Sequence, residues 1–355
     1  MEPGGGYGYR REETMRERIA YLDFLRCLAI FLVILLHTLV PVVTNTGVYG
    51  APSWKLCVAL DALTRVGVPL FFMLSGYLML SREGTRQFAA FYRKNLPKIG
   101  IPLVVWNLIY YGESLLMHDE TFRLRDFLAG LLNQGHSYHM WFVYTLLGIY
   151  LLCPFLKRMT EGCTGSQLLL LVGIILFPTA IQPILNLAQP VYIHLFGPLM
   201  EGYLGYFLLG YWLGGRKLTP KARRLLYILG AAAYLIAFLG NLRQASPQSI
   251  PLPFNGGYRL HHYFTAAAVF VLVRTFFEDH AKVEAALSAP LAWLSNRVFG
   301  IYWVHVLVLE TVTRTAGAQM SILMFVGVRL GLTVLISLLF AAVVSKIPVL
   351  RRGLV

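Results

Sequence analysis

The feature that most constrains the fold is a series of apolar runs, each about 20 residues long, that recurs through the whole chain. A helix of that length spans the hydrocarbon core of a bilayer. Only 14% of the 355 residues are charged and the mean hydropathy is +0.61, whereas soluble domains carry about a quarter charged residues. The sequence therefore predicts an all-α, polytopic membrane protein with about ten transmembrane helices. We place these spans near 21–43, 57–80, 97–117, 139–157, 166–184, 191–213, 224–241, 260–277, 289–313 and 320–346.

The distribution of basic residues predicts the orientation in the membrane. If the N-terminus is cytoplasmic, roughly two thirds of the 31 Lys and Arg residues fall in inside segments, as the positive-inside rule requires. Both termini are then cytoplasmic, with 1–18 a flexible segment and 19–355 a single transmembrane domain. The same bias accounts for the net charge of +14, so the lipid bilayer is the expected partner and nucleic acid is not.

The first span carries three ionisable residues on one face. Arg26 and His37 are eleven positions apart, so they share a face of the helix roughly 16 Å apart along its axis. Asp23 precedes Arg26 by three residues and points nearly the same way. Ionisable groups inside a membrane are costly and mark functional sites, so these three are the expected catalytic residues.

The imidazole of His37 suits the role of a general base, because neutral histidine accepts a proton near pH 7. Asp23 is too far along the helix to orient it, so a partner for His37 is expected from another span. The alternatives are a histidine bonded to the backbone and a purely structural ion pair between Arg26 and Asp23.

Two further patterns have structural interpretations. Asp61 and Arg65 lie four residues apart on one helix face and are predicted to pair with each other. His261 and His262 are adjacent and so do not share a face, and no metal site is expected.

Several stretches together resemble a known family, in order and over nearly the whole chain. They are 21–26 (YLDFLR) with His37, 68–77 (VPLFFMLSGY), 91–102 (FYRKNLPKIGIP), 139–144 (HMWFVY), 205–210 (GYFLLG) and 295–305 (SNRVFGIYWVH). The chain resembles the bacterial acyltransferase-3 membrane O-acyltransferases, in the stand-alone form that lacks a periplasmic esterase-like domain. The resemblance implies a ten-helix protein of the bacterial cytoplasmic (inner) membrane. It also implies transfer of an acyl group, usually acetyl, from cytoplasmic acyl-CoA to a hydroxyl of a cell-envelope carbohydrate or lipid-linked glycan.

The resemblance also implies where the donor binds. In the family, the Arg-x10-His pair of the first helix is required, and here that pair is intact. Arg26 lies near the cytoplasmic end of its span and is expected to bind a CoA phosphate. A second motif, Arg-x2-Arg after the second span, is tied to the CoA donor and falls on Asn95 and Lys98, so its first charge is missing. Arg93 or Lys94 is expected to supply that charge. Acetyl-CoA or another acyl-CoA is then a co-substrate, and no tightly bound cofactor is implied.

The expected acceptor-binding residues are spread over four spans. His139 and Trp141 lie at the outer mouth of the fourth span, and His305 lies within the ninth. Glu113 and Glu201 lie in or near the outer halves of spans three and six, where an unpaired carboxylate is costly. Sugar hydroxyls would satisfy these carboxylates, and pairing of a carboxylate with Arg329 or a histidine is the alternative.

Three other functions remain compatible with the sequence. One is a transporter or flippase for an envelope lipid or small anion, with the polar face of the first span as its path. Another is a succinyl-type acyltransferase that uses the same site. The third is a membrane sensor that keeps the fold without the chemistry, which the altered Asn95-x2-Lys98 motif allows. The sequence carries no indication of the oligomeric state.

Overall fold

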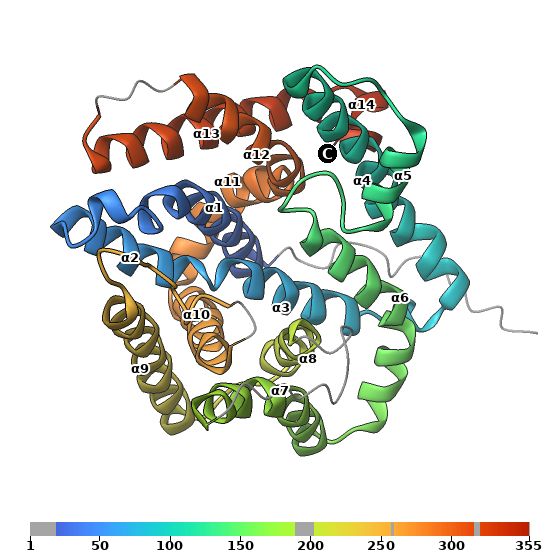
Figure 1. The fold of residues 1–355 in the computed structure, drawn as a ribbon. Helices are drawn as coiled ribbons and strands as arrows, with labels where there is room; N and C mark the ends of the chain where they lie inside the picture. Colours follow the sequence, from blue (N-terminus) through green and yellow to red (C-terminus); the bar gives the residue numbers. More distant parts are fainter. Residues whose placement is uncertain (1–18, 189–201, 257–258, 316–319, 355) are drawn as a thin grey trace, which may run out of the picture.

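A computed structural model describes residues 19–188, 202–256, 259–315 and 320–354, and all regular secondary structure in these ranges is helical (Figure 1). Seven helices within these ranges are long and apolar enough to cross a membrane, and one bent helix pair raises the number to eight. The prediction of an all-α, multi-pass membrane protein is confirmed. The count of ten spans and the cytoplasmic location of the termini stay predictions. The expected flexible segment 1–18 and part of the sixth span, 191–201, lie outside the described residues.

The first two spans form three helices, α1 (Ala20–Val43), α2 (Pro52–Thr64) and α3 (Gly67–Leu80). The second span is interrupted between α2 and α3, where Pro69 has no N–H to donate to the carbonyl of Arg65. The guanidinium of Arg65 contacts both carboxylate oxygens of Asp61, at 2.7 and 2.9 Å. The predicted pair is therefore confirmed, and it lies next to the break.

The third span, α4 (Phe88–His118), begins nine residues before its expected start at 97. The basic residues Arg93, Lys94 and Lys98 therefore lie on the first turns of a helix, not in a loop. The C-terminal helix α14 (Pro348–Leu354) lies beside α4, where the indole N–H of Trp106 donates to the carbonyl of Leu354 at 3.4 Å (Figure 1).

The expected ninth span is a bent pair of helices, α11 (Ala281–Ser295) and α12 (Val298–Thr315), whose axes differ by 55°. The described part of the sixth span is the short helix α8 (Tyr203–Gly214). The remaining helices are η1 (Thr46–Val48), η2 (Glu83–Arg86), α5 (Leu124–Leu132), α6 (Trp141–Gly162), α7 (Gly165–Ala188), α9 (Pro220–Gln244), α10 (Leu260–Asp279) and α13 (Ile322–Val344).

Two glycines let α3 and α8 approach each other at backbone distance. A Cβ atom at Gly76 would collide with the carbonyl of Phe207, and one at Gly210 would collide with the backbone of Met73. Small residues at such crossings are the usual means of close helix packing in membranes. This packing holds in place the α3 residues that face the functional site.

Candidate functional site

A cavity of about 340 Å³ lies at the end of the bundle where α1, α4 and α12 begin and α3 ends. We call it the basic cavity. Three cations line it, and no carboxylate is among the lining residues, all of which are described. The polar residues of its wall are Arg26, Ser75, Arg82, Asn95, Lys98, Tyr150, Ser295 and Tyr302, and the rest of the lining is apolar, with the rings of Phe71, Phe142 and Phe299.

Arg26 is held at the wall of the basic cavity by two neighbours. Its Nη1 donates to the carboxylate of Asp23 at 3.1 Å and to the hydroxyl of Ser295 at 3.3 Å. Asp23 itself is buried. The side chain that the sequence singled out therefore bridges α1 and α11 and faces the cavity.

The residues expected at the donor site divide into two groups. Asn95 and Lys98 line the basic cavity, and the amide of Asn95 donates to the carbonyl of Phe91 in its own helix at 2.9 Å. Arg93 and Lys94 are exposed and do not contribute to the cavity wall.

Arg82 also lines the cavity. From the sequence it belongs to a basic cluster after the second span, with Arg86, Arg93, Lys94 and Lys98, which is expected to attract CoA phosphates collectively or only to hold the topology. Which members of this basic cluster face the cavity depends on the tertiary structure.

Arg86, the next cation along the chain, belongs to an ion pair instead. Its guanidinium contacts Glu161 at 2.7 Å, and Lys157 contacts the same carboxylate at 2.8 Å. Hydrogen bonding to Glu161 raises the pKa of Arg86 above its ordinary value. These contacts join η2 to the end of α6.

Three histidines from distant parts of the chain meet in the interior. His37 comes from α1, His139 from the segment before α6, and His305 from α12. The ring centroid of His305 is 5.5 Å from that of His37 and 5.1 Å from that of His139. His139 and His305 are buried, whereas His37 is partly exposed. We call these three residues the histidine cluster.

Each buried histidine of the cluster has one bonded and one unbonded ring nitrogen. Nδ1 of His305 donates to the carbonyl of Tyr302 at 2.5 Å, and Nδ1 of His139 is hydrogen bonded to the hydroxyl of Ser137 at 2.9 Å. Nε2 of both rings is buried and has no hydrogen-bond partner in the described part of the chain. Unsatisfied buried polar groups are uncommon, and a catalytic role is one explanation for them.

The histidine cluster lies between the basic cavity and a second pocket. Tyr302 lines the basic cavity, and its ring is 5.3 Å from that of His139, while its hydroxyl donates to the carbonyl of His139 at 2.7 Å. On the other side, the ring of Tyr138 is 5.2 Å from that of His37. Tyr138 lines a pocket of about 350 Å³ formed by residues 133–138 and Trp141, which we call the Tyr138 pocket. The ring of Trp141 also packs against Tyr203 at 5.1 Å.

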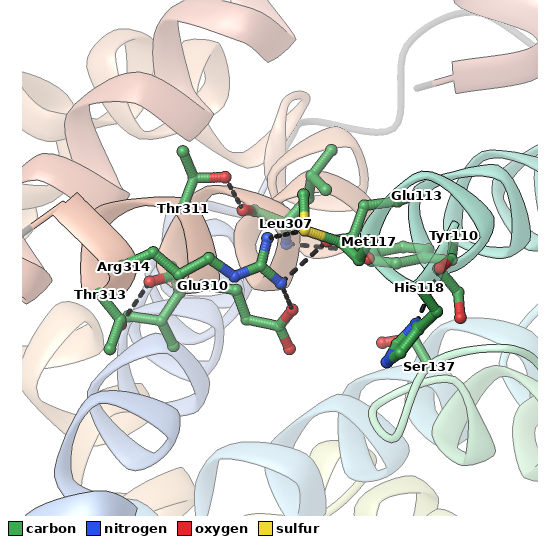
Figure 2. Close-up of polar contacts among 12 residues, drawn as sticks. Tyr110, Glu113, Met117, His118, Ser137, Leu307, Glu310, Thr311, Thr313 and Arg314 are labelled. Atoms are coloured by element: carbon green, nitrogen blue, oxygen red, sulfur yellow. Dashed lines mark hydrogen bonds and ion pairs between the residues drawn. The ribbon is translucent and has the colours of Figure 1, made fainter. Parts of the chain in front are cut away.

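Glu113 forms an ion pair with an arginine that the sequence did not indicate as its partner. Its carboxylate contacts Arg314 at 3.0 Å, and Arg314 also contacts Glu310 at 3.4 Å, as Figure 2 shows. The alternative prediction, that Glu113 pairs with Arg329 or a histidine, is therefore wrong about the partner. Glu113 is not among the residues that line either pocket. Glu201 lies outside the described residues.

Arg329 is a buried cation that joins three helices. Its guanidinium donates to the carbonyl of Thr38 at 2.8 Å and to the hydroxyl of Thr313 at 2.9 Å. It therefore anchors α13 to α12 and to the turn of α1 that carries His37.

The adjacent histidines of α10 both contact the same backbone group. Nε2 of His261 and Nε2 of His262 each lie 2.9 Å from the carbonyl of Phe254. In the described ranges, no group of three His, Cys, Asp or Glu residues is arranged to hold a metal ion.

These features define a multi-pass membrane protein with a polar, histidine-containing centre and a cation-lined cavity at one end. A family model described as an acyltransferase domain matches residues 19–343, and the chain belongs to this acyltransferase-3 family. It is a membrane acyltransferase. No curated protein and no solved structure matches the chain.

Proposed function

We propose that the protein transfers an acyl group, acetyl in the first place, from cytoplasmic acyl-CoA to a hydroxyl of a cell-envelope carbohydrate or lipid-linked glycan. In this proposal it acts in the bacterial inner membrane. The observation that carries the proposal is the order of the basic cavity, the histidine cluster and the Tyr138 pocket through the bundle. Such an order provides separate approaches for two substrates and a proton acceptor between them.

The donor would bind in the basic cavity. Coenzyme A carries several phosphate charges, which guanidinium and ammonium groups bind well. Arg26, Arg82 and Lys98 supply three cations at the wall, with Arg82 in place of the charge that Asn95 lacks. A volume of about 340 Å³ is within the range of small-molecule sites. The pantetheine arm would then extend along α1, over the roughly 16 Å that separate Arg26 from His37.

The acceptor would enter through the Tyr138 pocket. Amide, hydroxyl, imidazole and aromatic groups line this pocket, and no Lys, Arg, Asp or Glu does. Such a lining suits the hydroxyls and apolar faces of a neutral sugar, with Trp141 as a flat apolar surface. His139, with its unbonded Nε2, would bind the reacting hydroxyl.

In the chemical step, the acceptor oxygen bonds to the thioester carbon and the carbon–sulfur bond breaks. His37 takes the hydroxyl proton and then returns it to the leaving thiolate, so that free CoA and an ester are the products. Direct transfer needs no acyl-enzyme. An acyl-histidine relay through His37 is the variant that a trapped covalent intermediate would reveal.

The first test is calorimetric titration of the detergent-purified protein with acetyl-CoA, with Arg26→Ala as the comparison. We expect saturable binding by the wild type and loss of that binding in Arg26→Ala, because the variant removes a cation from the cavity wall. A parallel titration with succinyl-CoA distinguishes the acyl chain. If the folded wild type binds neither donor, the proposal fails and the transport hypothesis takes its place.

A further inference from the structure

His305 has a ring whose orientation and tautomer are determined by its own helix. Its Nδ1 lies 2.5 Å from the carbonyl oxygen of Tyr302, one turn earlier in α12. A carbonyl oxygen only accepts hydrogen bonds, so Nδ1 carries the hydrogen. In neutral His305, Nε2 therefore carries a lone pair that points in a defined direction and can accept a hydrogen bond.

That lone pair has no hydrogen-bond donor in the described part of the chain, although the atom is fully buried. Leaving such an acceptor unsatisfied is unfavourable, because the buried group has lost its hydrogen bonds to water. The rings nearest to His305 belong to His139, His37 and Tyr302, with centroids at 5.1, 5.5 and 5.8 Å. The hydroxyl of Tyr302 is already donated to the carbonyl of His139, so two imidazoles remain as donors.

Of these two imidazoles, His37 is the one to which the described residues provide no hydrogen bond. His139 is held through Nδ1 by Ser137, whereas the ring nitrogens of His37 have no partner among the described residues. Two imidazoles joined by an N–H···N bond of about 3 Å have centroids roughly 5 Å apart. The observed centroid separation of 5.5 Å is close to that value, and the two ring planes differ by 34°.

We infer that His305 is a positioning residue for His37, whose ring N–H it accepts at Nε2. The other nitrogen of His37 then keeps its lone pair and is directed at the acceptor hydroxyl. After proton transfer, the imidazolium of His37 retains its bond to His305 until it protonates the leaving thiolate. The general base is thus oriented by a hydrogen-bonded partner, as the histidine of a catalytic triad is, but here that partner is an imidazole anchored to a backbone carbonyl. The catalytic part of this inference rests on the proposed function, whereas the hydrogen bond does not.

The first test does not depend on activity. Nitrogen-15 NMR of histidine-labelled protein in lipid distinguishes protonated from unprotonated ring nitrogens, and His37→Asn assigns the His37 signals. We expect a single tautomer of His37 in the wild type and a mixture of both in His305→Leu. His305→Gln, whose side-chain oxygen is an acceptor, should restore the single tautomer. Unchanged His37 signals in a folded His305→Leu protein would overturn the inference.

The second test uses transfer kinetics. We expect His305→Leu to lower kcat about 100-fold with an unchanged KM for acyl-CoA, and His305→Gln to recover all but about tenfold of the loss. The double variant His37→Ala/His305→Leu should be no slower than His37→Ala, because His305 acts through His37. Independent, multiplying losses would contradict the inference.

A matched control variant and the NMR measurement, which needs no activity, distinguish failure of the inference about His305 from failure of the proposed function. His262→Leu removes another buried histidine bonded to a carbonyl, outside the histidine cluster, and should leave the His37 signals unchanged. If the wild type transfers no acyl group from any donor, the proposed function fails, and the NMR comparison still decides whether His305 orients His37.

Discussion

At the scale of single residues, the helical period decides which polar residues at the start of α4 face the basic cavity. Once α4 begins at Phe88, the positions 91, 95, 98 and 99 fall on one face of the helix. Asn95 and Lys98 therefore line the basic cavity, whereas Arg93 and Lys94 point to the exterior. The sequence identified the cluster but not this division, because the start of α4 was expected nine residues later.

The difference between cations that line the cavity and cations that face the exterior predicts different effects for two arginine substitutions. Arg82→Ala should weaken acetyl-CoA binding about tenfold, since it removes one charge-assisted phosphate contact. Arg93→Ala removes the same charge from the same cluster but outside the cavity, and should change the Kd less than twofold. Calorimetry of both variants measures the difference. Equal weakening by both would show that the net charge of this face, and not a site at Arg82, attracts the donor.

At the scale of helices, apolar runs locate the spans, whereas glycine and proline decide how the spans bend and pack. Pro69, in the first turn of α3, lacks the N–H that would continue the helix from α2, and the Gly76 and Gly210 pair brings α3 against α8. The sequence located these residues in apolar runs. It did not indicate which glycine faces another backbone, because that depends on the rotation of both helices.

The α3–α8 contact predicts a position-specific cost for added methyl groups. Gly210→Ala should lower the thermal stability of the purified protein, because the new Cβ collides with the backbone of Met73 and such overpacking costs about 1–3 kcal/mol. Gly148→Ala in α6 is the matched control, since nothing lies within 4 Å of its Cβ. That variant should be neutral or slightly stabilising, because alanine favours helix formation. A melting temperature lowered equally in both would contradict the packing explanation.

At the scale of the whole molecule, the two pockets are offset along α6. Trp141 at the start of this helix lines the Tyr138 pocket, and the basic cavity extends along α6 from Phe142 to Tyr150. The last turns of α6 pair with η2 beyond the cavity. In the orientation that the positive-inside rule predicts, the basic cavity would face the cytoplasm and the Tyr138 pocket the outer side. Under the proposed function, donor and acceptor would then reach the histidine cluster from opposite sides.

Opposite sidedness is testable by labelling in oriented membranes. In a variant without the four native cysteines, Lys98→Cys should react with a membrane-impermeant thiol reagent only from the cytoplasmic side. Gln134→Cys, at the exposed rim of the Tyr138 pocket, should react only from the outside. Labelling of both positions from one side would contradict the proposed orientation and, with it, the separate entry of the two substrates.

The sequence by itself determined the membrane class, the helical composition, the family and the shared face of Arg26 and His37. These properties depend on hydropathy and on the period of a single helix, both of which are local. Only the tertiary structure decided that His37, His139 and His305 meet, that Glu113 pairs with Arg314, and that Arg82 joins Arg26 at the basic cavity. Such contacts join helices far apart in the chain, so they depend on where each helix begins, bends and rotates against its neighbours.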